Sequence, residues 1–257
     1  MVAILCTSVY GSACSTAGLV RQRNEDSFTL MRQAFPPGET KASLRWQGWL
    51  TWCAVMDGMG GERLGDAASR AAAKALARQG SRLRWGKPAR AADALVRRMN
   101  DAVRRTLGGQ RGGTTLALAF LRGGRLYTCH AGDSRIYLLR DGALTRLTRD
   151  HVPGGAVRNP KDAPRAHALL RYLGAEEDGA GLCQTGGPLR VRRGDRLLLC
   201  SDGITDMLAD GDILRLLKAS DSPEQASQAL LDAAMAAGGR DNATAVVLFI
   251  GKNLRRG

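Results

Sequence analysis

Three short apolar runs in this sequence each lead into a turn that carries an aspartate. The runs cover residues 50–56, 126–131 and 197–200, and the aspartates are Asp57, Asp133 and Asp202. The first run is apolar on both faces, which is typical of a strand buried between two layers. A fourth apolar run, residues 243–250, begins just after Asp241. Carboxylates at the ends of buried strands offer oxygen ligands for a hard metal ion.

The rest of the pattern predicts helices and a run of antiparallel strands. We expect helices at residues 66–79, 88–107, 210–219 and 223–237. The last of these has Ser222 as its N-cap, Pro223 at its first position and Gly238 as its stop signal. Short turns predict a meander of strands at residues 114–121, 126–130, 135–140 and 144–147. Because helices follow strands without a βαβ repeat, the fold class is a layered α+β pattern.

Length and composition favour one domain. With 257 residues and 44% apolar content, residues 1–257 lie at the upper end of what one core can hold. The six cysteines include no C-x-x-C pair and predict small buried side chains in a reducing compartment. The N-terminus lacks the charged region of a signal peptide, and no apolar run is long enough to span a membrane. We therefore expect a cytoplasmic protein without a membrane partner.

The chain is strongly basic, with a formal net charge of +14. Half of this charge falls in residues 81–111, within which residues 88–107 predict an amphipathic helix. Its arginines are Arg90, Arg97, Arg98, Arg104 and Arg105. This helix contains no aromatic residue for stacking on bases, so a solvated outer face is favoured over a nucleic-acid surface. Residues 152–185, rich in glycine and charge, predict a surface flap with a short helix near residues 165–173.

Seven short motifs occur in order along the chain. They are Gly18-Leu-Val-Arg21-x-x-Asn24-Glu25-Asp26-Ser27, Asp57-Gly-Met-Gly-Gly61, Gly113-Thr-Thr115, Gly132-Asp133-Ser134-Arg135, Asp150-His151, Ser201-Asp202-Gly203 and Arg240-Asp241-Asn242. As a set they resemble the bacterial branch of the metal-dependent type 2C serine/threonine protein phosphatases, the PPM family. The resemblance runs from about residue 18 to residue 250.

This resemblance implies a four-layer αββα sandwich in which two antiparallel sheets are flanked by helices. It also implies two Mn²⁺ or Mg²⁺ ions, and in bacterial relatives a weaker third ion, at one end of the sandwich. Asp57 would bridge two ions, Asp202 and Asp241 would complete one of them, and the carbonyl group of Gly58 would contact the other.

The remaining site residues take roles from the same resemblance. Glu25 would hold water on the second ion, and Asp133 would bind the third ion together with Asp202. Arg21 would grip the substrate phosphate, for which its planar guanidinium is suited. Two such ions activate a water for in-line attack on a phosphomonoester, and a ligand set of oxygen atoms selects Mn²⁺ or Mg²⁺.

Several residues near these motifs admit a structural interpretation. Asp133 could instead pair with Arg135, Asp141 fits a hairpin turn, and Asp26 and Asn242 suit supporting roles better than direct metal binding. Relatives from eukaryotes have a histidine where this chain has Met59. The three histidines are more typical of structural hydrogen bonds than of catalysis, and His151 is the one with a possible catalytic role.

The predicted function is hydrolysis of phosphoserine and phosphothreonine in proteins, opposing a serine/threonine kinase in bacterial signalling. Narrower alternatives are a phosphatase of secretion machinery and a partner-switching phosphatase of an anti-sigma antagonist. An alternative of another class is a phosphatase-fold binding module whose basic helix docks an acidic partner. We expect a monomer that acts on phosphoproteins and does not bind nucleic acid.

Overall fold

The computed structural model describes the chain except residues 1–3, 154–167, 177–180, 252–253 and 257. One sheet has the strand order β11 (Ala143–Arg146), β10 (Arg135–Arg140), β13 (Arg196–Cys200), β14 (Ala243–Ile250) and β1 (Ile4–Thr16). In this sheet β1 also pairs with β15 (Leu254–Arg256) and β4 (Thr40–Gly48). The other has the order β12 (Gln184–Arg190), β9 (Arg125–Ala131), β8 (Leu116–Arg122), β5 (Leu50–Met56), β2 (Ser27–Leu30) and β3 (Gln33–Phe35). A small ribbon joins β6 (Gly58–Met59) to β7 (Gly113–Thr114).

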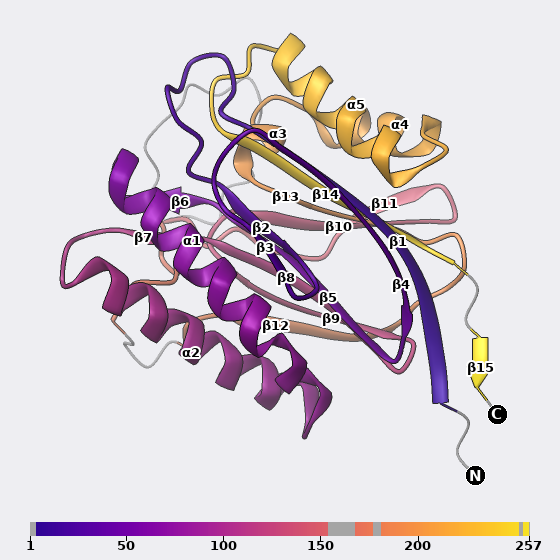
Figure 1. The fold of residues 1–257 in the computed structure, drawn as a ribbon. Coiled ribbons are helices and arrows are strands. Elements are labelled where there is room, and N and C mark those ends of the chain that lie inside the picture. Colours follow the sequence, from indigo (N-terminus) through magenta and orange to yellow (C-terminus); the bar gives the residue numbers. More distant parts are fainter. Residues whose placement is uncertain (1–3, 154–167, 177–180, 252–253, 257) are drawn as a thin grey trace.

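The helices of the described chain cover the outer faces of the two sheets (Figure 1). They are α1 (Glu62–Gln79), α2 (Pro88–Leu107), α3 (Asp202–Thr205), α4 (Asp210–Ala219) and α5 (Pro223–Ala236), with a 3₁₀ turn, η1 (Gly80–Arg84), after α1. In Figure 1, α1 and α2 lie on one side of the strands and α4 and α5 lie on the opposite side. The predicted α+β sandwich with antiparallel sheets is confirmed.

Alternation along the central strands builds three apolar layers. On β14, Val246 and Leu248 face the other sheet, whereas Ala245 and Val247 face α4 and α5. A third cluster joins the outer face of the β5 sheet to α1 and α2. Because successive side chains of a strand point to opposite faces, a strand covered on both sides must be apolar throughout. Every residue of β5 is buried, in agreement with the prediction for residues 50–56.

Three of the four long predicted helices agree with the structure to within one residue, and the fourth, α1, differs at its start. α2 and α4 have the predicted bounds, α5 ends one residue early at Ala236, and the N–H of Gln225 donates to Ser222 Oγ at 3.2 Å. By contrast, α1 begins at Glu62, four residues before the predicted start. Gly65 disfavours a helix in isolation, but α1 includes it because the packed fold overrides that preference.

The predicted meander is wrong in its middle connection. β8 pairs with β9 and β10 pairs with β11, but β9 and β10 belong to different sheets. The second edge of β9 is occupied by β12, so the chain crosses at Gly132, whose φ is 95°, and continues in the other sheet. A short connection can do this because stacked sheets lie only about 10 Å apart.

The predicted short helix in the flap is also wrong over its described residues. Residues 168–173 are not helical, and Leu173 instead forms an antiparallel bridge with Thr114. The end of the predicted flap, residues 184–185, belongs to β12, an exposed edge strand that the sequence pattern did not predict. Among the described residues, no helix is long and apolar enough to cross a membrane.

Candidate functional site

A cavity of about 370 Å³ opens at one end of the two sheets. The predicted site residues in its lining are Arg21, Glu25, Asp57, Gly58, Asp133, Asp202 and Asp241. The other described residues in the lining are Met59, Gly60, Gly61, Thr115, Leu169 and Asn242. The structure therefore brings every predicted site residue to one place, although they span more than two hundred positions in sequence.

Asp57 is held at the end of β5 by the Thr114–Thr115 pair. Its N–H donates to Thr115 Oγ1 at 2.9 Å, and its carbonyl oxygen accepts from the Thr115 N–H and Thr114 Oγ1, both at 2.8 Å. At Gly58, an added Cβ would overlap the backbone of Gly65. The aspartate therefore needs a glycine after it, because α1 packs directly on the turn.

Asp202 begins the four-residue helix α3, which directly follows β13. The sequence pattern predicts the end of β13 but not this helix. An added Cβ at Gly203 would overlap the carbonyl group of Asn242, so the turns that carry Asp202 and Asp241 are packed against each other. Asp241 Oδ2 accepts from Arg21 Nη2 at 2.7 Å in a partly exposed ion pair.

Asn242 is the residue that fixes the loop before β2. Its Oδ1 accepts from the N–H of Glu25 at 2.8 Å, and its Nδ2 donates to the carbonyl groups of Ala17 and Arg23. Ser69 on α1 also donates to the carbonyl oxygen of Glu25 at 2.5 Å. These contacts support the positioning role expected of Asn242, and they orient Glu25 toward the cavity.

Asp26 is fully buried and does not line the cavity. Its Oδ2 accepts from Ser201 Oγ at 2.7 Å and from Thr244 Oγ1 at 2.6 Å, and its Oδ1 has no hydrogen-bond partner. Burial raises the pKa of Asp26 to about 7, although its two hydroxyl donors oppose this shift. Asp26 therefore ties the start of β2 to the end of β13 and to β14.

Asp133 lies in the crossing from β9 to β10, two residues before Arg135. Arg135 forms its ion pair with Asp150, with Nη2 to Oδ2 at 2.8 Å and both side chains buried. Ser134 links the crossing to the residue before β8 through a 2.7 Å hydrogen bond with Thr115 Oγ1. The role of Asp133 as a ligand of a third ion remains a prediction.

The charge distribution of the cavity suits a divalent cation. Desolvation raises the pKa of Asp57 well above its usual range, and the neighbouring Asp26, Asp202, Asp133 and Asp241 raise it further. A hard cation would relieve this repulsion, and all the side chains expected to bind it offer oxygen atoms. Within the described residues, however, no three acidic, histidine or cysteine side chains already form a ready set of ligands. The cavity thus has a carboxylate lining rather than a preformed metal cage.

His130 and His151 are not among the residues that line the cavity. His130 Nε2 contacts the carbonyl oxygen of Arg149 at 2.9 Å, and His151 Nδ1 accepts from the N–H of Gly132 at 3.2 Å. The two imidazole rings stack with centroids 4.7 Å apart. These contacts support structural roles and speak against the possible catalytic role of His151. His167 lies outside the described residues.

The stacked histidines predict a pH dependence of stability. Desolvation and the neighbouring His130 lower the pKa of His151 to about 4, below its unfolded value of about 6.5. The folded protein therefore binds fewer protons than the unfolded chain between these pH values, so stability is lost as pH falls from 6.5 toward 4. We expect His151→Gln to reduce this loss by on the order of 1 kcal/mol, after allowing for solvent screening.

Urea unfolding of both proteins at pH 7 and pH 5 measures this difference. Carboxyl groups with raised pKa values, such as that of Asp26, are present in both proteins and cancel in the comparison. An identical loss of stability in the two proteins would contradict the assignment to His151.

Comparison with known proteins identifies the family. The model of the protein phosphatase 2C family matches residues 40–237, and the chain belongs to this family. The serine/threonine protein phosphatase PstP of Mycobacterium tuberculosis is 34% identical over 249 residues, which are 92% of this chain but 44% of PstP. The chain thus spans less than half the length of this relative.

Two solved structures have the same fold over nearly the full chain. The catalytic domain of PstP in complex with two manganese ions is 32% identical, with a TM-score of 0.75, and the match covers 96% of this chain and all of that domain. PppA, described as a key regulatory component of T6SS in Pseudomonas aeruginosa, is 29% identical, also with a TM-score of 0.75. That match covers 95% of this chain and 99% of PppA.

Proposed function

We propose that this chain is a metal-dependent phosphatase that hydrolyses phosphoserine and phosphothreonine in proteins. The observation that carries the proposal is one cavity, within a protein phosphatase 2C fold, whose lining combines five carboxylates with Arg21. We also propose that residues 1–257 form one phosphatase domain, in which the segment 152–185 borders the cavity through Leu169.

The carboxylates are the residues that would hold Mn²⁺ or Mg²⁺. Asp57, Asp202 and Asp241 are the proposed direct ligands, with the carbonyl group of Gly58 beside them and Glu25 acting through water. Asp133 is the proposed ligand of a third ion. When bound, such cations supply a nucleophilic water near neutral pH and neutralise the phosphoryl oxygens during in-line displacement.

Arg21 is the proposed phosphate-binding residue. Its guanidinium group lies at the cavity, 2.7 Å from Asp241 Oδ2, and its side chain is 58% exposed. A substrate phosphate would compete with Asp241 for these donors and accept two parallel hydrogen bonds from the planar fork. Arg21 would thereby orient the phosphorus atom toward the carboxylate-lined floor, where positioning contributes much of the catalysis.

The cellular setting belongs to the same proposal. A soluble phosphoprotein phosphatase of this kind would oppose a serine/threonine kinase in bacterial signalling. The similarity to PppA makes regulation of a secretion system one candidate setting.

Phosphate release from a phosphothreonine peptide and from para-nitrophenyl phosphate tests the proposed chemistry. With Mn²⁺ or Mg²⁺ the protein is expected to hydrolyse both substrates, because the carboxylate lining suits hard cations. EDTA should abolish this activity, and added Mn²⁺ should restore it. Absence of activity with both cations, or activity that EDTA leaves unchanged, would refute the proposal.

A further inference from the structure

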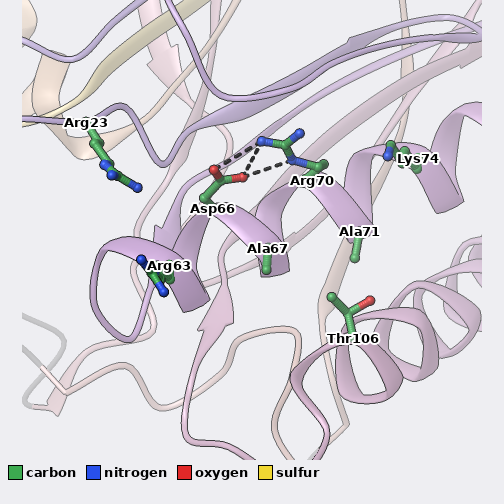
Figure 2. A pocket seen from close by; sticks show the side chains of 8 residues that line it. All are labelled: Arg23, Arg63, Asp66, Ala67, Arg70, Ala71, Lys74 and Thr106. Atoms are coloured by element: carbon green, nitrogen blue, oxygen red, sulfur yellow. Dashed lines mark hydrogen bonds and ion pairs between the residues drawn. The ribbon is translucent and has the colours of Figure 1, made fainter.

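A second hollow, of about 380 Å³, lies beside α1 on the α2 side (Figure 2). We call it the basic pocket; the lining residues that matter here are Arg23, Arg63, Asp66, Arg70, Lys74 and Thr106. Four of these side chains are cationic and one is a carboxylate. The described residues of the lining therefore carry three positive charges in excess.

The one carboxylate is already neutralised within the pocket. Arg70 Nε and Nη2 donate to Asp66 Oδ1 at 2.9 and 2.7 Å, and Nη2 also reaches Oδ2 at 3.1 Å. Figure 2 shows this pair with Arg23 and Arg63 on one side of it and Lys74 on the other. Arg63 and Lys74 are exposed, so their charges face a ligand arriving from solvent.

The basic pocket and the acidic cavity share one loop as a wall. Arg21 and Glu25 line the cavity, whereas Arg23, midway between them, lines the basic pocket. Two residues of chain span at most about 7 Å, so the two hollows are close neighbours. The loop is fixed by the Asn242 bond to the Arg23 carbonyl group at 2.8 Å and by the Ser69 bond to Glu25.

Helix α1 is the second shared wall. Gly65 packs against the carboxylate of Glu25, where an added Cβ would overlap the carboxylate, and the next residue, Asp66, already belongs to the basic pocket. An extended peptide advances about 3.3 Å per residue, so a group two to four residues from a phosphoresidue in the cavity would reach the basic pocket.

We propose that the basic pocket is a substrate subsite for a second anionic group, a carboxylate or a phosphate, next to the phosphoresidue that is hydrolysed. This inference rests on the proposed phosphatase function and adds a substrate class to it: acidic or multiply phosphorylated segments. The positive excess supplies the attraction, and the shared loop supplies the spacing.

Three phosphothreonine peptides of one sequence test the subsite. They carry glutamine, glutamate or a second phosphothreonine at the positions two to four residues from the first phosphate. The wild-type protein is expected to show about tenfold higher kcat/KM for the anionic peptides than for the glutamine peptide. In Arg63→Gln/Lys74→Gln this preference should fall to about twofold, because two of the three excess charges are removed.

Arg78→Gln/Arg82→Gln is the matched control, because it removes the same charge from exposed residues near the end of α1. The control should keep the tenfold preference. An unchanged preference in Arg63→Gln/Lys74→Gln, or an equal fall in the control, would overturn the subsite. A higher kcat/KM for both the glutamate peptide and the doubly phosphorylated peptide identifies a general anion subsite. A higher kcat/KM for the doubly phosphorylated peptide alone identifies a phosphate subsite.

Binding measured by fluorescence anisotropy in EDTA keeps this test separate from catalysis. The Kd of the doubly phosphorylated peptide should rise severalfold in Arg63→Gln/Lys74→Gln and stay unchanged in the control. If wild-type protein fails to hydrolyse any substrate yet shows this binding pattern, the proposed function fails and the subsite stands. If hydrolysis is normal and the binding pattern is missing, the subsite fails alone.

Discussion

Replacing Asp57 by asparagine is expected to lower kcat/KM for phosphopeptide hydrolysis by about a thousandfold. The substitution removes several kcal/mol of charge stabilisation at the proposed metal site, and each 1.36 kcal/mol of activation free energy changes the rate about tenfold. Burial raises the pKa of Asp57, and four neighbouring acids raise it further. Asparagine keeps the size of the side chain and one oxygen atom, but it removes the negative charge that we propose bridges two cations.

The same substitution is expected to stabilise the protein when EDTA removes divalent cations. The pKa of Asp57 is raised on folding, so the folded state holds the proton more tightly and the charged form opposes folding at pH 7. Removing a poorly solvated charge of this kind should raise the unfolding free energy by about 1–3 kcal/mol. Adding Mn²⁺ should then stabilise the wild-type protein more than Asp57→Asn, because ligand binding to the native state stabilises it by mass action.

Steady-state kinetics and thermal unfolding with Mn²⁺ or EDTA measure both effects. Asp141→Asn is the matched control, because Asp141 lies in the β10–β11 turn and its side chain is 79% exposed. The control should change neither activity nor the response to Mn²⁺. Equal activity of Asp57→Asn and wild type, or an equal gain in stability from Mn²⁺, would contradict the role of Asp57.

The parts of the fold that depend on local pattern could be predicted from sequence. β5 and β14 are apolar on both faces because layers cover both sides, and α2 keeps its apolar stripe because it packs on one sheet. β1 was not predicted, although it is 13 residues long. Its serines and glycine carry little strand propensity, and its place in the sheet depends on pairing with β14 and β4.

Contacts between distant segments limited the prediction of the site. The placement of Asp57 and Asp202 followed from the ends of apolar strands, a local signal. The hydrogen bond by which Asn242 holds Glu25 could not be predicted from neighbouring residues, because the two residues lie 217 positions apart in the sequence. Likewise, no signal in the sequence separates a turn that returns to the same sheet from one that crosses between sheets, which is why Asp133 was placed in a meander.

The buried pair of Arg135 and Asp150 gives the largest expected effect on stability. Arg135 donates to both oxygens of Asp150, and the two side chains are only 4% and 3% exposed. Arg135 also lies within 3.4 Å of the Tyr137 hydroxyl group, which donates to Asp210 at the start of α4. This chain of contacts ties the loop after β11 to the helical layer.

Arg135→Met is expected to lower the unfolding free energy by about 3–5 kcal/mol, because it leaves the buried carboxylate of Asp150 with only part of its compensation. Arg146 still pairs with Asp150, which keeps the loss from being larger. The double variant Arg135→Met/Asp150→Leu should be more stable than Arg135→Met, since the incompletely compensated charge is gone. Urea unfolding at pH 7 measures these differences.

Arg192→Met is the matched control, because it removes an exposed ion pair instead of a buried one. Arg192 pairs with Asp141 at 3.3 Å, but the two side chains are 63% and 79% exposed. Its loss should cost less than about 1 kcal/mol, because water already solvates both charges. If Arg135→Met cost no more than Arg192→Met, the ion pair would be incidental to the fold. If the double variant were less stable than Arg135→Met, lost packing rather than an uncompensated charge would explain the effect.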